Sequence, residues 1–144
     1  MNKPLGTRLA AIKGGAMSSY ELYTERMLNY WEKAQKPIHP SVITHSAEVQ
    51  SPICGDNVYV EANIKNSILS EIGIFPRGCC VCDACCAIIA EAMVGRTVAE
   101  LQNFSKDDLR DLVAVVVPNE RHYCMSMGLR ALQALKPHIS RSLI

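Results

Sequence analysis

The chain has 144 residues, of which about half are apolar, and a formal net charge of +1. This length suits one domain whose core needs no disulfide support, and the composition excludes disorder and gives no electrostatic reason to bind nucleic acid. No apolar run approaches the ~18 residues that a membrane span requires, and the N-terminus lacks the apolar stretch of a secretory signal. We therefore expect a cytoplasmic protein without a nucleic-acid or membrane partner. A location in an organellar matrix is the second choice, because residues 1–20 carry three basic residues and no acid.

The N-terminal part is predicted to contain a flexible tail and one helix. Residues 1–17 form the tail, and residues 18–144 form a single domain. Ser18 or Ser19 can cap a helix that runs to about Lys33, since short polar side chains are favoured at that position. Its predicted apolar face consists of Leu22, Met27, Leu28 and Trp31. Pro37 and Pro40 then lead into extended chain.

Three consecutive segments read as strands. The first covers residues 42–49. In residues 58–64 and 68–75, apolar side chains alternate with other residues, as they do in a half-buried strand. Lys65-Asn66-Ser67 is a plausible hairpin turn between the last two. Three successive strands predict an antiparallel sheet.

The second half of the chain is predicted to be helical. A loop with Pro76 and Gly78 delivers Cys79 to the start of a helix that Gly95 stops. Thr97 and Ser105 can each cap a short helix. Pro118 and Asn119 start a last helix, whose apolar stripe consists of Cys124, Met127, Ala131, Leu132 and Leu135, before Pro137. Strands followed by helices predict an α+β domain, with the helices packed on one face of a three-stranded antiparallel sheet.

The seven cysteines suggest metal or redox chemistry, because an odd number without a secretory signal argues against a disulfide framework. Cys54 lies in a loop before a strand, Cys79 at a helix start, and Cys124 in the first turns of another helix. If rigid elements bring these ends together, three thiolates suit zinc or an iron–sulfur cluster. Asp56 is the obvious fourth ligand. Nearby positive charge can come from Arg77 and Arg121.

Other readings of these residues stay open. Cys82, Cys85 and Cys86 share one helical face, where free cysteine often serves as a small buried apolar residue. The spacings Cys79-x-x-Cys82 and Cys82-x-x-Cys85 also match a redox dithiol. Cys80 is either structural or a spare ligand. The remaining candidate ligands are histidines that read as surface or loop residues, His39, His45 and His138, and His122, which is near Cys124 in the sequence.

Three motifs resemble a known family. Cys-Gly-Asp at 54–56, Gly78-Cys79 before a helix that ends at Gly95-Arg96, and Arg-His-Tyr-Cys at 121–124 occur in this order. They resemble the IscU/SufU/NifU-type iron–sulfur cluster assembly scaffolds over about residues 20–136. The resemblance implies a compact α+β domain with a three-stranded antiparallel sheet. It also implies a binding protein that is not an enzyme.

The resemblance further implies roles for individual residues. Cys54, Cys79 and Cys124 become sulfur ligands of a [2Fe-2S] cluster, and Asp56 closes the site, in which zinc or iron is an alternative occupant. The implied partners are a cysteine desulfurase, which donates sulfur, and recipient apo-proteins or carrier proteins. Cys124 is the expected persulfide acceptor. The chain is expected to be a monomer or a homodimer.

The sequence also departs from the family pattern. Tyr123 stands where ISC-type scaffolds have a histidine, and residues 117–121 hold only a reduced form of their chaperone-recognition motif. The 45 positions between Cys79 and Cys124 leave no room for the SufU-type insertion. Two alternatives follow: a zinc-bound, SufU-like sulfur acceptor that stimulates a desulfurase without holding a cluster, and a structural zinc or dithiol domain.

Overall fold

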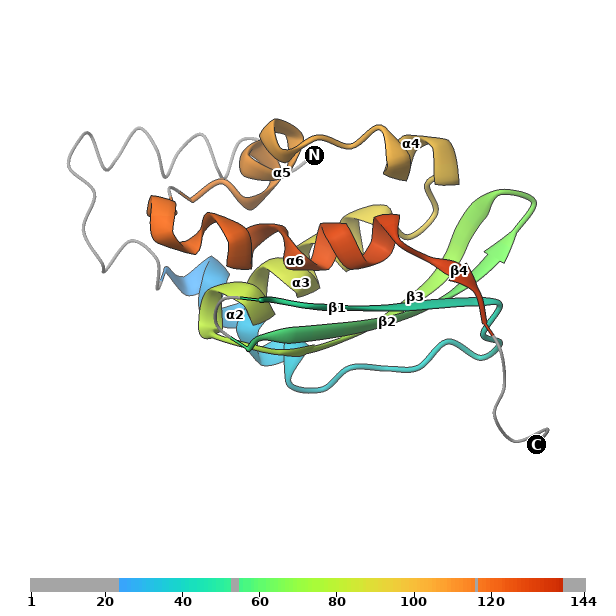
Figure 1. The fold of residues 1–144 in the computed structure, drawn as a ribbon, viewed down its shortest axis with the longest axis horizontal. Coiled ribbons are helices and arrows are strands. Elements are labelled where there is room, and N and C mark those ends of the chain that lie inside the picture. Colours follow the sequence, from blue (N-terminus) through green and yellow to red (C-terminus); the bar gives the residue numbers. More distant parts are fainter. Residues whose placement is uncertain (1–23, 53–54, 116, 139–144) are drawn as a thin grey trace.

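The computed structural model describes residues 24–52, 55–115 and 117–138. Figure 1 shows an antiparallel sheet with helices α3 and α6 above one face, and with α4 and α5 farther from the sheet. The elements in chain order are α2 (Glu25–Ala34), β1 (His45–Gln50), β2 (Asn57–Lys65), β3 (Ile68–Arg77), α3 (Cys80–Met93), α4 (Val98–Gln102), α5 (Lys106–Val113), the 3₁₀ turn η2 (Asn119–Arg121), α6 (His122–Gln133) and β4 (Lys136–Pro137). The predicted α+β class is confirmed. None of the helices in these ranges is long and apolar enough to cross a membrane.

The sheet has four strands in the order β3-β2-β1-β4, with every neighbouring pair antiparallel. The predicted hairpin between β2 and β3 is present, and its turn residues Asn66 and Ser67 both have positive φ, as a tight two-residue turn requires. The prediction of three strands was wrong. Residues 136–137 add a short edge strand beside β1, pairing with Ser46 and His45. Two residues are too few to show an alternating pattern.

The core lies between the sheet and the α3–α6 layer. β2 contributes Val58, Val60 and Ala62, each fully buried. The segment between α2 and β1 passes the sheet on the side away from α6 (Figure 1). Gly73 of β3 allows this close passage, because a Cβ atom there would stand 2.8 Å from the carbonyl oxygen of Ile38.

The first described helix differs from its prediction. Ser18, Ser19 and Leu22 lie outside the described residues, and α2 begins at Glu25 with Thr24 as the N-cap, whose hydroxyl accepts from the Met27 amide. Met27 is buried, but Leu28 and Trp31 are 44% and 36% exposed. The face that packs on the core instead combines Met27 with Tyr30 and Ala34.

The predicted starts of α3, α4 and α5 are confirmed, whereas the last helix is shorter than predicted: α6 begins at His122, after η2, and ends at Gln133, and Pro137 lies in β4. α3 runs from Cys80 to Met93 with Cys79 as its N-cap, and Gly95 follows it with φ +88°. Thr97 and Ser105 form capping boxes with Glu100 and Asp108 at the starts of α4 and α5. In α6, the predicted stripe is buried from Cys124 to Leu132, whereas Leu135 lies beyond the last helical residue.

Candidate metal centre

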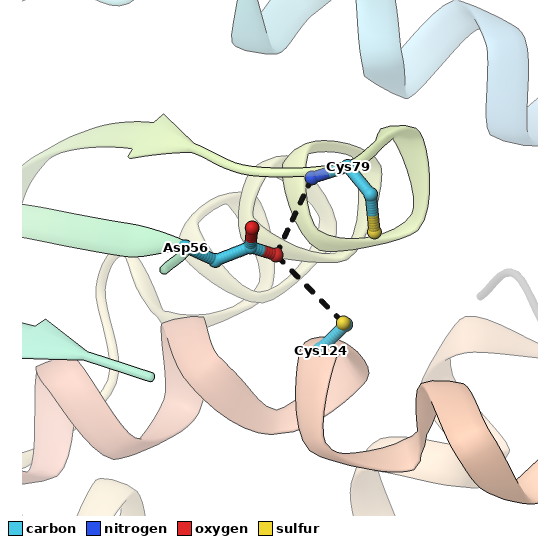
Figure 2. A group of neighbouring side chains, drawn as sticks. All are labelled: Asp56, Cys79 and Cys124. Atoms are coloured by element: carbon cyan, nitrogen blue, oxygen red, sulfur yellow. Dashed lines mark hydrogen bonds between the residues drawn. The ribbon is translucent and has the colours of Figure 1, made fainter. Parts of the chain in front are cut away.

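Three potential ligands from different elements meet at one end of the sheet. Asp56 directly precedes β2, Cys79 caps α3, and Cys124 lies in the first turn of α6. One carboxylate oxygen and the two sulfur atoms all lie within 4.8 Å of one another, and Figure 2 shows the three side chains facing a common point. The structure thus brings together three of the four predicted ligands. Cys54, the fourth, lies outside the described residues.

A single oxygen of Asp56 connects the other two residues. Its Oδ2 accepts a hydrogen bond from the Cys79 amide at 3.4 Å, and the Cys124 thiol donates to the same oxygen at 3.8 Å (Figure 2). Gly78 makes room for this carboxylate, because a Cβ atom at that position would stand 2.8 Å from Oδ2. The position of the Asp56 carboxylate therefore depends on glycine at position 78.

Local structure explains why these side chains lie at the site. The Asp56 carbonyl accepts from the Ser51 amide at 2.8 Å, and Gly55 between them has φ +78°, a conformation that suits glycine. Cys79 holds the N-cap position without a side-chain capping hydrogen bond. Its thiol is thus not engaged by the α3 amides.

The two described cysteines of the site differ in exposure. Cys79 is half-buried, whereas Cys124 is 9% exposed. Two thiolates and one carboxylate form a donor set that suits zinc or iron, since soft sulfur ligands select such metals and a carboxylate adds a harder oxygen. The residues present therefore fit the predicted class of metal site.

Three of the four cysteines within α3 lie in the core. Cys82, Cys85 and Cys86 are at most 1% exposed, which confirms the prediction that they pack as apolar residues. Burial raises the pKa of the Cys85 thiol far above its usual value, and a hydrogen bond with Cys82 together with burial raises the pKa of Cys86. Cys80 is half-buried, and burial raises its thiol pKa as well. No disulfide joins any two of the six described cysteines.

The four histidines make hydrogen bonds away from the candidate metal centre; His39 and His138 lie outside helices and strands, as predicted, whereas His45 lies in β1. His122 bonds through Nε2 to the Val117 carbonyl oxygen at 2.7 Å, His39 to Glu61 at 2.7 Å, and His45 and His138 to hydroxyl groups. Tyr123, at the position of the family histidine, has its ring 4.6 Å from the guanidinium of Arg130.

Of the two arginines predicted to supply positive charge, Arg121 lies close enough to Cys80 to oppose part of the rise in the pKa of that thiol, which burial causes. Arg77 is exposed at the end of β3.

Sequence reasoning missed one residue beside the site. Asp83, in the first turn of α3, is 8% exposed and accepts a hydrogen bond from the Gly78 amide at 3.3 Å. Burial raises the pKa of the Asp83 carboxyl group. The hydrogen bonds from Gln35 and Gly78 oppose this rise in part. The available signal was a carboxylate in an otherwise apolar helical turn.

Comparison with known proteins identifies the family. The family described as "NifU-like N terminal domain" matches residues 22–141. A comparison with curated proteins gives no match.

Solved structures share the fold. The N-terminal NifU-like protein from Brucella abortus superimposes with a TM-score of 0.63 at 16% identity, over 78% of this chain and 90% of that one. A protein from the thermophilic Fervidobacterium islandicum AW-1, described as a candidate iron–sulfur cluster assembly scaffold for the SUF system, gives a TM-score of 0.64 at 14% identity, over 81% and 97% of the two chains. The resemblance read from the sequence is confirmed, and the chain belongs to the NifU-like N-terminal domain family.

Proposed function

We propose that this protein is a scaffold on which an iron–sulfur cluster is assembled and from which the cluster is passed to recipient apo-proteins or carrier proteins. The observation that carries the proposal is the convergence of Asp56, Cys79 and Cys124 within 4.8 Å in a chain of this family. Cys54, two positions before Asp56, completes the proposed ligand set. The cargo we propose is a [2Fe-2S] cluster.

The mixed ligand set suits cargo that must leave. Four thiolates retain a cluster, whereas a carboxylate is a harder and more weakly held ligand for iron. Asp56 Oδ2 is the acceptor for both the Cys79 amide and the Cys124 thiol. The same oxygen can therefore hold the site together when no cargo is bound.

Sulfur would arrive from a cysteine desulfurase by thiol exchange. The Cys124 thiolate attacks the outer sulfur of the desulfurase persulfide; that S–S bond breaks, the desulfurase thiolate leaves, and a persulfide forms on Cys124. Cys79 is more exposed than Cys124 and could be reached by the desulfurase more easily. Persulfide formation at the two cysteines must therefore be compared by experiment.

Anaerobic assembly with ferrous iron, L-cysteine and a cysteine desulfurase tests the proposal. We expect iron, acid-labile sulfide and visible charge-transfer absorption in the wild type, and transfer of the cluster to an apo-ferredoxin. Cys79→Ser and Cys124→Ser should lose nearly all bound cluster, because each removes a thiolate. Cys80→Ser, the matched control on the same helix, should assemble normally. Mass spectrometry should find a persulfide on Cys124 in the Cys79→Ser variant.

A zinc-bound sulfur acceptor is the second candidate. The same two thiolates and carboxylate suit zinc, and Tyr123 replaces the histidine that ISC-type scaffolds carry. Metal analysis of protein purified without oxygen separates the two functions. Stoichiometric zinc, with persulfide formation but no labile sulfide after the assembly reaction, would reject the scaffold and favour the sulfur acceptor.

A further inference from the structure

Two buried or half-buried carboxylates hold neighbouring amides of the loop that leads into α3. Asp56 Oδ2 accepts from the Cys79 amide at 3.4 Å, and Asp83 Oδ1 accepts from the Gly78 amide at 3.3 Å. The Gly78 amide belongs to the Arg77–Gly78 peptide and the Cys79 amide to the next peptide, so each of the two consecutive peptides before the Cys79 side chain is held by one carboxylate. Only Asp56 belongs to the candidate metal centre, so Asp83 has another role.

The second oxygen of Asp83 is also engaged. Gln35, the C-cap of α2, donates from Nε2 to Asp83 Oδ2 at 3.2 Å and to the Trp31 carbonyl oxygen at 3.1 Å. A continuous set of hydrogen bonds therefore runs from the last turn of α2 through Asp83 to the amide of Gly78.

Packing alone does not explain an acid at this position. Asp83 is 8% exposed, with the buried residues Val81, Cys82 and Ala84 next to it in α3. Burying a carboxylate lowers the free energy of unfolding, because the charged group loses its hydration, and an apolar side chain at the same position would not have this cost. The other acid of α3, Glu91, is exposed and pairs with Lys33 at 3.3 Å. What Asp83 adds is an acceptor for the loop amide.

We infer that Asp83 is a positioning residue, which together with Gln35 fixes the Arg77–Gly78 peptide, one residue before Cys79, so that the Cys79 sulfur faces Asp56 and Cys124. The importance of this placement for cluster assembly rests on the proposed function, whereas the placement itself does not. Residues that orient a ligand typically change metal affinity by about 10- to 100-fold when they are removed.

The test compares Asp83→Ala, Asp83→Asn and Gln35→Ala with the controls Asp111→Ala and Asp111→Asn. Asp111 is an exposed acid of α5, so its variants make the same chemical changes on a different helix. The first readout is the rate at which iodoacetamide alkylates Cys79 in the metal-free protein, followed by peptide mass spectrometry. The second is affinity for cobalt(II), whose visible d–d absorption reports thiolate coordination and geometry.

We expect Asp83→Ala to alkylate several-fold faster at Cys79 than Asp111→Ala, and to bind cobalt(II) about tenfold more weakly with an altered d–d spectrum. Asp83→Asn should show only the smaller change expected for Gln35→Ala, because its amide oxygen still accepts from Gly78 while its amide nitrogen cannot accept from Gln35. Gln35→Ala should show a smaller change in the same direction. If Asp83→Ala fails to fold, Gln35→Ala takes its place in the test, because Gln35 is exposed and its loss should not disturb the core.

Each contrary outcome has one meaning. Equal alkylation rates in Asp83→Ala and Asp111→Ala would overturn the inference whatever the cobalt result. Equal acceleration in Asp83→Ala and Asp83→Asn would assign the effect to charge and also overturn positioning. If wild-type protein takes up no cobalt(II), the proposed function fails, and alkylation still decides the role of Asp83.

Discussion

Helix α3 presents cysteine in two environments that are about one turn apart. At its N-terminal end, Cys79 is half-buried beside Asp56 and Cys124, with its thiol not used for capping. From Cys82 onward, the thiols lie in the core, where burial raises the pKa of Cys85 and keeps the sulfur uncharged.

This difference shows that position along the helix, more than residue type, decides what a sulfur atom can do. A thiolate is needed to bind metal or to attack a persulfide. The N-terminal end places the Cys79 sulfur beside Asp56 and Cys124, whereas the interior surrounds its thiols with buried residues and pairs Cys82 with Cys86 in a hydrogen bond. The unusual number of cysteines in α3 is thus explained in part by packing, and the predictions below test that division.

The largest effect should follow from filling the space that Gly78 leaves open. In Gly78→Ala, the added Cβ would stand 2.8 Å from Asp56 Oδ2 and 3.0 Å from the Cys82 Cβ. The carboxylate must therefore move away from both cysteines, and we expect cobalt(II) affinity to fall about tenfold or more, as measured by competition with a chelator.

Gly95→Ala is the control at the other end of α3. Gly95 has φ +88° with no atom within 4 Å of an added Cβ, so alanine there strains the backbone without approaching the site. Its thermal midpoint should fall while its cobalt(II) affinity stays unchanged. Equal cobalt(II) affinities in Gly78→Ala and Gly95→Ala would show that the position of the Asp56 carboxylate does not depend on glycine at position 78.

The sequence alone predicted the elements that carry the site. Gly78 marked the loop, Cys79 the helix start, and the alternation after Asp56 the strand, because turns, caps and periodicity are local signals. Pro76 was expected in the loop but lies in β3. With these elements, the α+β class and the convergence of Asp56, Cys79 and Cys124 could be anticipated.

What depends on packing between elements could not be read in the same way. Periodicity gave α2 an apolar face that included Leu28 and Trp31, whereas the helix turns Tyr30 and Ala34 toward the core. The role of Asp83 depends on Gln35, which is 48 positions away in the sequence. Such a pair has no signature in either segment.

A second effect should follow from crowding the core cysteines against α6. In Gly128→Ala, the added Cβ would stand 2.9 Å from the Cys86 sulfur and 3.1 Å from its Cα. Overpacking costs roughly 1–3 kcal/mol and helix propensity returns at most about 1 kcal/mol, so we expect a net loss of about 1–2 kcal/mol in urea unfolding.

Cys86→Ala should relieve part of that loss, because it removes the sulfur atom that the new methyl group meets. The double variant should therefore be more stable than the sum of the single changes predicts, by roughly 0.5 kcal/mol or more. If the stability changes of the two single variants simply add, α3 and α6 move apart in Gly128→Ala and the new methyl group does not crowd the Cys86 sulfur. Cobalt(II) affinity should not change in any of these variants.

The smallest effect concerns the protonation of the core thiols. Burial raises the pKa of Cys85 in the folded protein, whereas an unfolded thiol ionises at about pH 8.5. The folded state thus keeps a proton that the unfolded state releases, so stability is fully present below about pH 8.5 and declines above it. Between about pH 7.5 and about pH 9.5, we expect a loss of about 1 kcal/mol from this thiol.

Urea unfolding of wild type and Cys85→Ala at both pH values isolates that loss, because lysines and tyrosines titrate alike in the two proteins. The alanine variant should be less stable at neutral pH, having lost packing, and should lose less stability on going to high pH. Parallel declines would mean that Cys85 ionises inside the folded protein, and the distinction between reactive and packed sulfur along α3 would then not hold.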